Sequence, residues 1–218
     1  MMPELNFTCA ARALWRVSDE QPKPDVSFVP PMERRRLTGV ERAALSVAWQ
    51  VRPPAGEEIP VVFASRWGEI GVTAKLMQQF HADGEMSPAG FSASVHNATP
   101  GAFSLLTKNH ASYTAIAARS RSLETGLLES FALRRPVLFV YAEEATPALY
   151  QGAFGEEVSA HAVALRLAPA DNVDVGTSWR VALRADDAVA PLSFDSFADF
   201  LAGRRERVVS SSFTLMRV

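Results

Sequence analysis

The 218-residue chain is close to electrical neutrality, because 24 aspartates and glutamates oppose 22 lysines and arginines to give a formal charge of −2. Proteins that bind nucleic acid concentrate positive charge, so this balance argues against a nucleic-acid partner. Hydrophobic residues make up 48% of the chain and charged residues 21%, which is typical of a folded globular protein. A chain of this length suits one packed core, and we expect residues 1–218 to form a single domain.

The chain has one cysteine, Cys9, so no internal disulfide and no cysteine-based metal cage can form. Its N-terminal residues lack the basic segment and apolar run of a secretory signal. The longest strongly apolar stretch, residues 136–142, is far shorter than the roughly 20 residues that cross a bilayer. These features predict a cytoplasmic protein without a membrane partner.

Prolines crowd the N-terminal quarter, where half of the 14 prolines fall before residue 55. We therefore expect residues 1–55 to be a Pro-rich portion of the domain, with extended connections around one helix. The three-to-four spacing of apolar residues places that helix at 37–50. The arginines at 34–36 precede it and suggest either a phosphate site or, as we favour, a solvated connector or a partner contact.

Strands and helices alternate in the middle of the chain. Short apolar runs predict buried strands at residues 60–66, 113–117 and 136–142. Apolar residues at helical spacing predict helices at residues 69–82, 88–106 and 120–133. We expect the first helix to bury Ile70, Ala74, Met77 and Phe80. The second begins with an N-cap at Ser87, and we expect Pro100 and Gly101 to break it in two. This order predicts the α/β class, with helices packed on a mixed sheet.

The last third of the chain changes character. Residues 160–168 and 178–185 are predicted strands, and we expect them to pair antiparallel because only a short turn-rich segment joins them. A short helix at 194–202 and a final strand at 208–216 complete the prediction.

Common catalytic motifs are missing from the sequence. It contains no nucleophile elbow, phosphate loop, dinucleotide-binding glycine motif or H-E-x-x-H zinc motif. The four histidines lie far apart along the chain, so we expect no metal site. Glu143 and Glu144 follow a buried strand, where α/β sheets place their sites. Adjacent strand residues face opposite ways, so we expect one glutamate to have a structural or capping role and the other to face solvent.

His96 and Asn97 form a polar pair inside an apolar helical stripe, just before the Pro-Gly break. If it is buried, such a pair must form hydrogen bonds. Two interpretations stay open: Asn97 caps the end of the helix, or the pair faces a partner or a substrate tunnel.

Four segments, in chain order, resemble one protein family: PVVFASRWGE, SPAGFSASVHNATPGAFSLL, YTAIAARSRSLETGLLES and PVLFVYAEE. They are similar to the N-terminal domain of β-ketoacyl synthase-like proteins, and within them to the short chain-length-factor-like subunits found with aryl polyene or type II polyketide gene sets. The resemblance covers residues 5–167. Its most distinctive piece is S-V-H-N-A, in which Asn97 and Gly101 match an N-x-x-x-G pattern. It implies the N-terminal half of a thiolase-like fold.

The same resemblance shows that a reactive group is missing. In active ketoacyl synthases, the turn after the strand matched by residues 113–117 carries the cysteine that accepts the acyl chain. Ala118, Arg119 and Ser120 occupy this turn here, so we interpret it as a degenerate nucleophile turn. Ser120 and Ser122 are more simply helix N-caps, and Cys9 is more simply a small buried hydrophobe in the first strand. Nothing matches the second half of an active synthase, so we expect no condensing activity and no cofactor.

Members of this family dimerise by aligning one strand from each subunit, and the resemblance places that strand at 113–117. Its sequence, YTAIA, is uncharged and apolar, and such a strand at a sheet edge invites association until a partner covers it. We therefore expect Tyr113, Thr114 and Ile116 at a partner interface, with His96 and Asn97 near the shared surface.

These observations lead to one main hypothesis and two alternatives. The main hypothesis is a non-catalytic, chain-length-factor-like subunit that forms a heterodimer with a full-length β-ketoacyl synthase in polyketide or aryl polyene biosynthesis, with an acyl carrier protein as a further partner. One alternative is a small acyltransferase or thioesterase-like enzyme that uses Ser120 or Cys9. The other is a homodimeric acyl-binding module that pairs the same strand with itself.

Overall fold

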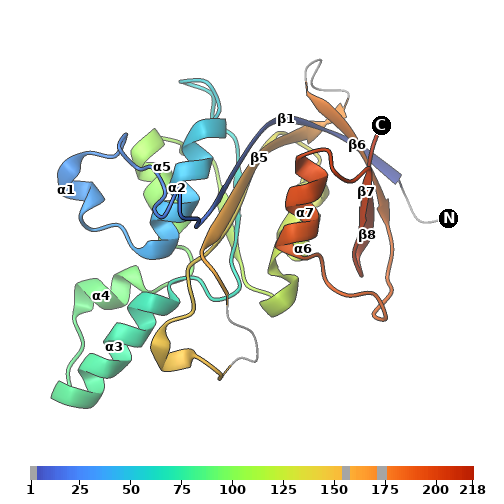
Figure 1. The fold of residues 1–218 in the computed structure, drawn as a ribbon. Coiled ribbons are helices and arrows are strands. Elements are labelled where there is room, and N and C mark those ends of the chain that lie inside the picture. The colour runs from blue at the N-terminus through green and yellow to red at the C-terminus, as the bar shows by residue number, and fades with distance from the viewer. Residues whose placement is uncertain (1–3, 154–157, 171–175) are drawn as a thin grey trace.

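The computed structural model describes residues 4–153, 158–170 and 176–218. These residues form one eight-stranded sheet with helices on both faces (Figure 1). The strands are β1 (Glu4–Arg16), β2 (Val61–Ala64), β3 (Tyr113–Ile116), β4 (Val137–Glu143), β5 (His161–Pro169), β6 (Thr177–Leu183), β7 (Arg207–Val209) and β8 (Phe213–Arg217). The helices are α1 (Pro31–Arg34), α2 (Gly39–Val51), α3 (Ile70–Asp83), α4 (Pro88–Ala93), α5 (Ala98–Thr107), α6 (Ser122–Ala132) and α7 (Phe194–Leu201), with short 3-10 helices at Arg119–Arg121 and Ala148–Tyr150. The predicted α/β class with a mixed sheet is confirmed.

The strands lie in the order β3-β2-β4-β5-β1-β6-β8-β7. The first three are parallel to one another, and the remaining neighbours pair antiparallel. Parallel strands need crossover connections, which helices supply here. The chain passes through α3, α4 and α5 between β2 and β3, and through α6 between β3 and β4. This topology leaves β3 at one edge of the sheet.

The longest strand, β1, lies between β5 and β6 and pairs antiparallel with both. The predicted direct pairing of residues 160–168 with 178–185 is therefore wrong, because these segments are separated by β1 and run parallel to each other. Part of the segment predicted to join them, residues 171–175, lies outside the described residues. The predicted final strand at 208–216 is instead a hairpin of β7 and β8.

Side chains alternate across β4 and enter two separate cores. Val137, Phe139 and Tyr141 join the core that α6 and α7 cover. Leu138 and Val140 join the core that α2 and α5 cover. Figure 1 shows these two helix pairs on opposite sides of the sheet. All five side chains are buried, which explains why this strand is an uninterrupted apolar run in the sequence.

Helix α6 packs unusually close to the sheet. A Cβ placed on Gly126 would lie 2.7 Å from the Ala64 Cβ and 2.7 Å from Cε2 of Phe139. The glycine therefore allows the helix to approach β2 and β4 without a clash. This contact positions the turn that leads from β3 into α6.

Two details of the predicted helices are wrong. The helix break falls at residues 94–97 and not at Pro100 and Gly101, which lie inside α5. Proline is tolerated there because the N–H groups of a first turn have no partner within the helix. Met77 and Phe80 of α3 are 52% and 48% exposed, because α3 contacts α4 rather than the sheet. Figure 1 shows α3 and α4 projecting from the body of the molecule.

Among the described residues, no helix combines the length and the apolar character that crossing a membrane requires.

Candidate functional site

Strand β3 has β2 as its one neighbour among the described residues. The carbonyl oxygens of Ser112 and Ile116 accept hydrogen bonds from the β2 side at 3.0 and 3.1 Å. Backbone groups alternate along a strand, so those of Tyr113 and Ala115 face away from β2. The side chains of Tyr113 and Thr114 are exposed, and that of Ile116 is half-buried. The strand thus presents an open edge that can accept another strand.

The structure brings His96 to the end of β3. Its Nε2 lies 2.9 Å from the carbonyl oxygen of Ile116, and its ring centroid lies 5.6 Å from that of Phe63. Asn97 is exposed and occupies the N-cap position of α5 without a capping hydrogen bond from its side chain. The interpretation that Asn97 caps a helix end is therefore wrong, since it begins a helix. His96 connects the segment between α4 and α5 to the open strand.

The turn between β3 and α6 contains a left-handed residue, Arg119, with a φ of 51°. Ser122 holds this turn: the N–H of Ala118 donates to its hydroxyl oxygen at 2.9 Å, and its hydroxyl donates to the Arg119 carbonyl at 2.8 Å. Ser120 is exposed in the short 3-10 helix. Neither serine is the N-cap of α6, which is Arg121, so that prediction is wrong. The turn offers hydroxyl groups and no thiol.

Cys9 lies in β1 with 3% of its surface exposed. Its Sγ donates to the carbonyl oxygen of Ala11 at 3.4 Å. Burial raises the pKa of the thiol to about 12, and the nearby Arg12 guanidinium only partly opposes this. The thiolate is the nucleophilic form, so this environment suppresses reactivity. The prediction that Cys9 is a small buried residue in the first strand is confirmed.

Glu143 is the last residue of β4, and Glu144 follows it. Both side chains accept hydrogen bonds from the segment that follows β2. Glu143 is 2% exposed and accepts hydrogen bonds from the Arg66 backbone N–H and, at 3.3 Å, from the Ser65 hydroxyl. Burial raises its pKa to about 7. Glu144 accepts from the Gly71 N–H at 2.7 Å, in the first turn of α3, where the helix dipole favours a carboxylate. The prediction that one glutamate faces solvent is wrong, because both hold this connection.

The sequence reasoning missed a third carboxyl group, that of Glu69. It is 2% exposed; its Oε1 accepts from the Thr99 hydroxyl at 3.0 Å, while its Oε2 has no hydrogen-bond partner among the described residues. Burial raises the pKa of Glu69 to about 8, and the charges of Glu41 and Glu144 add to the effect. The raised pKa favours the neutral form of this carboxyl. The available signal was its place at the start of the predicted helix, where the structure makes it the N-cap residue of α3.

The histidines do not gather into a site. His81 and His110 are exposed. His161 is buried, with Nδ1 2.7 Å from the Ser159 carbonyl oxygen, and burial lowers its pKa to about 4. Within the part of the chain that the structure describes, no group of three or more His, Cys, Asp or Glu is placed to hold a metal ion.

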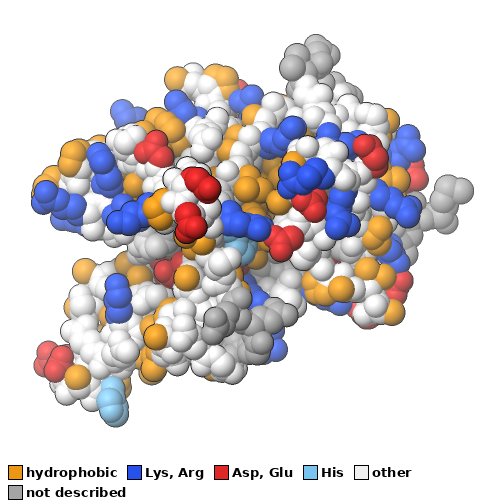
Figure 2. Space-filling view, viewed as in Figure 1, with side chains coloured by type: hydrophobic (Ala, Val, Ile, Leu, Met, Phe, Trp, Pro, Cys, Tyr) orange, Lys and Arg blue, Asp and Glu red, His pale blue; other side chains and the backbone are white. Residues whose placement is uncertain are grey.

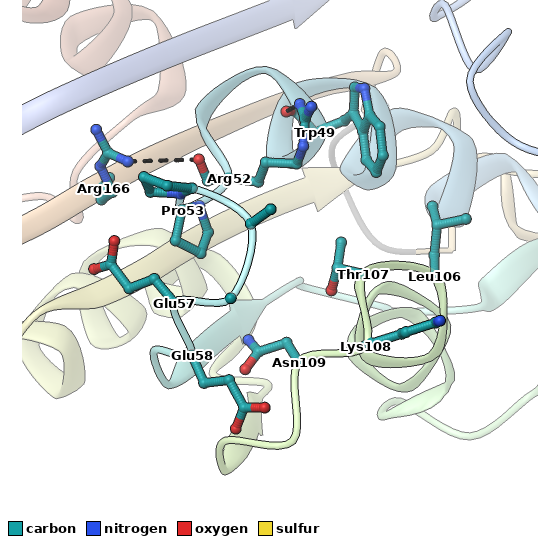
Figure 3. Close-up of a pocket in the computed structure, with 13 residues that line it drawn as sticks. Trp49, Arg52, Pro53, Glu57, Glu58, Leu106, Thr107, Lys108, Asn109 and Arg166 are labelled. Carbon is teal, nitrogen blue, oxygen red and sulfur yellow. Dashed lines mark hydrogen bonds between the residues drawn. The ribbon is translucent and has the colours of Figure 1, made fainter.

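A hollow of about 740 Å³ lies at the other end of the parallel strands, where the chain enters β2 and β3 (Figure 3). The Arg52 guanidinium stacks 3.8 Å from the Trp49 ring centroid, and Arg166 donates to the Arg52 carbonyl oxygen at 3.5 Å. Glu57 and Lys108 also line the hollow. This mixture of charges contains no nucleophile paired with a base.

Comparisons with known proteins identify the fold. The profile of the β-ketoacyl synthase N-terminal domain matches residues 9–200. A chain from the solved complex of the ketosynthase ApeO with its chain length factor ApeC from Xenorhabdus doucetiae is 21% identical, with a TM-score of 0.73. The match covers 99% of this chain and 97% of that one.

A second solved structure is that of AntDE:AntF (apo), a type II PKS acyl-carrier protein in complex with its ketosynthase bound to the hexaketide. A chain from it matches with a TM-score of 0.62 at 11% identity, over 78% of this chain and 64% of that one. No curated protein sequence matches the chain. The structural matches confirm the predicted thiolase-like architecture, and the profile covers most of the sequence. The chain belongs to the β-ketoacyl synthase N-terminal domain family.

Proposed function

We propose that the chain is a non-catalytic, chain-length-factor-like subunit that pairs with a full-length β-ketoacyl synthase in polyketide or aryl polyene biosynthesis in the cytoplasm. One observation carries the proposal: the open edge of β3 leads into a turn, Ala118 to Ser120, that contains no thiol, and the family resemblance matches this turn to the nucleophile turn of active synthases. Such a chain keeps the pairing surface of the family and lacks the group that accepts an acyl chain.

The solved relatives support this proposal through their length and their complexes. The match with the ApeO–ApeC complex covers nearly all of both chains, so the matched chain has nearly the same length as this one. That complex joins a ketosynthase to a chain length factor, and the second match comes from a complex that includes an acyl-carrier protein. We therefore include an acyl carrier protein as a further partner of the assembled pair.

Pairing through β3 has a defined geometry. A two-fold axis at the edge of a sheet brings two strands together antiparallel and continues the sheet across the interface. The backbone groups of Tyr113 and Ala115 would bond the partner, since they face away from β2. Leu105 lies on α5, a helix that contacts β3, and is 84% exposed, so an apolar side chain is available beside the strand. Figure 2 shows hydrophobic side chains at the surface of the α3 and α4 region.

The enzymatic alternative finds weaker support. The Cys9 thiol is buried and its pKa is raised, so it is a poor nucleophile. A serine nucleophile needs a base held against its hydroxyl. Among the described residues, His96 and His161 bond backbone carbonyl oxygens and not serine hydroxyls. A thioester of acyl carrier protein, incubated with the purified chain and analysed by intact mass, tests for an acyl adduct on Ser120 or Cys9.

The pairing is tested by co-expression of the tagged chain with the full-length ketosynthase of the same gene set. Ala115→Pro removes a backbone donor that faces away from β2 and leaves the β2–β3 ladder intact. Tyr113→Lys, a second variant, places a charge on the edge without changing the backbone. We expect the synthase to co-purify with the wild-type chain in a pull-down and not with either variant.

Two results would contradict the proposal. One is a wild-type chain that forms no complex with the synthase and leaves the length of its products unchanged. The other is a covalent acyl adduct that disappears on Ser120→Ala or Cys9→Ala. Circular dichroism of Ala115→Pro and Tyr113→Lys shows that a lost complex does not result from unfolding.

A further inference from the structure

Helices α3 and α4 form an arm that packs mainly against itself. The two helices contact each other more than any other element, and the pair projects from the body of the molecule (Figure 1). Leu76 of α3 is 7% exposed and lies against Gly90 of α4, where an added Cβ would meet Cδ2 of Leu76 at 3.0 Å. Like Leu76, the other buried side chains of α3, those of Ile70 and Ala74, belong to neither of the two main cores, and α4 has no buried residue. The packing of the main cores therefore does not fix the arm in place.

Both connections between this arm and the body meet at one place. The chain enters the arm through Gly68, which has a left-handed φ of 56°, and leaves it through residues 94–97. The backbone of Gly68 packs so closely against the His96 ring that a Cβ at this position would clash with the ring. Nε2 of His96 in turn lies 2.9 Å from the carbonyl oxygen of Ile116. Residues 68–69 and 94–97 thus form a hinge, because movement about them carries both helices together.

Glu69 occupies this hinge as the N-cap residue of α3, yet its side chain does not cap the helix. The carboxyl turns toward the body instead, where Oε1 accepts a hydrogen bond at 3.0 Å from the hydroxyl of Thr99, in the first turn of α5. Oε2 is buried without a hydrogen-bond partner among the described residues. Glu69 therefore connects the arm to α5 through its side chain.

Two further carboxyl groups face Glu69 from the body. Burial raises the pKa of Glu69, and the charges of Glu41 in α2 and Glu144 after β4 add to this effect. Backbone N–H groups hold Glu41 and Glu144 in place, and the positive charge of Lys75 in α3 acts on Glu144. Three neighbouring carboxyl groups cannot all ionise without an electrostatic cost. Of the three, Glu69 alone belongs to the arm, so its charge alone can leave the cluster when the arm moves.

We propose that α3 and α4 move as one body about the hinge, and that a proton on Glu69 holds this arm against α5. Opening of the arm releases the proton, because the carboxyl then meets water away from Glu41 and Glu144. In the closed arm, burial raises the pKa of Glu69 from 4.5 to about 8, so opening becomes easier as pH rises between these values and changes little above them. The exposed apolar side chains of Met77 and Phe80 move with the arm. This inference goes beyond the proposed function and concerns the chain without a partner.

Hydrogen exchange of the isolated full chain tests the hinge. Protection factors, which correct for the intrinsic pH dependence of exchange, are measured for the amides of α3, α4 and β4 from about pH 5 to about pH 9. A series at low urea concentrations separates local opening, which exposes little surface, from global unfolding, which exposes much. Glu69→Gln is compared with the wild type and with Glu85→Gln, which changes an exposed glutamate between α3 and α4.

We expect the protection of α3 and α4 in the wild type to fall by about tenfold per pH unit between about pH 5 and about pH 7.5 and to level off above about pH 8. Low urea should leave this protection unchanged, while that of β4 falls. In Glu69→Gln the side chain is neutral at every pH, so the fall in the protection of α3 and α4 should disappear. Glu85→Gln should behave as the wild type does.

Two results would overturn the inference. One is a protection of α3 and α4 that equals that of β4 and falls with urea in the same way, because the arm would then open only when the whole chain unfolds. The other is an equal pH dependence in Glu69→Gln and the wild type, because another group would then hold the proton. Neither result bears on the pairing through β3, which the pull-down tests separately.

Discussion

Replacing Glu69 with glutamine removes a buried carboxyl group without changing its shape. Glu69 is 2% exposed, and its Oε1 accepts a hydrogen bond from Thr99, which a glutamine carbonyl oxygen can also accept. The charges facing it are those of Glu41 in α2 and Glu144 after β4, and both disfavour ionisation. We expect Glu69→Gln to stabilise the protein near and above neutral pH.

The size of this effect follows from the shifted pKa. Burial raises the pKa of Glu69 from 4.5 to about 8 in the folded chain. Between these values the unfolded chain has lost the proton and the folded chain keeps it, so the free energy of unfolding falls as pH rises. The slope is about 1.4 kcal/mol per pH unit. The stabilisation by Glu69→Gln therefore grows from near zero at about pH 4.5 to at most about 4 kcal/mol at about pH 7.5.

Urea unfolding of both proteins across this pH range measures the difference directly. Glu143 and His161 also have shifted pKa values, about 7 and about 4, but they contribute equally to both proteins and cancel in the difference. Glu57→Gln, at an exposed glutamate, serves as a control and should show no pH-dependent gain. A difference between Glu69→Gln and the wild type that stays constant with pH would refute the reasoning.

Three further predictions concern packing and reactivity. Gly126→Ala should destabilise the chain by about 1–3 kcal/mol in urea unfolding, because the new Cβ would meet Ala64 and Phe139. Gly101→Ala should stabilise the chain, because its new Cβ would meet a single atom, at 3.7 Å. Equal effects of the two substitutions would contradict the packing argument. Cys9 should resist a maleimide in the folded chain and react once urea unfolds it, so rapid labelling of the native protein would show an accessible thiol. Ser122→Ala should cost about 1–3 kcal/mol, because the Ala118 N–H loses its acceptor; an unchanged unfolding midpoint would show that the turn does not need this hydroxyl.

The two carboxyl groups at the end of β4 act as a structural unit. Glu143 binds the residues that follow β2, and Glu144 binds the first turn of α3. A Cβ on Gly39 would clash with Oε2 of Glu144, so the start of α2 also packs against this carboxylate. Glu144 therefore ties together the N-termini of two helices. The connection that these carboxyl groups hold contains Gly68, and the His96 ring lies against it, since a Cβ on Gly68 would lie 3.1 Å from Cε1 of His96.

Local pattern was sufficient to predict most of the elements. The helix expected at 37–50 is observed as Gly39–Val51, and the strand expected at 136–142 as Val137–Glu143. Both have apolar residues at the period of their own secondary structure, and that period is a property of neighbouring residues. The absence of a thiol after β3 was also visible in the sequence, because it depends only on which residues stand at 117–120.

Tertiary structure decided what depends on residues far apart in the chain. The separation of β5 from β6 requires β1, from the other end of the chain, to lie between them, and no local pattern encodes that order. The raised pKa of Glu69 likewise comes from burial among residues of α2 and α5. The open edge of β3 and the strained backbone of Arg119 arise in the same way, from strand order and from a hydroxyl that fixes a turn. The period of the apolar residues determines the local helix or strand and which of its residues share an apolar face. Burial, strand pairing and backbone strain depend on which distant segments the fold brings into contact.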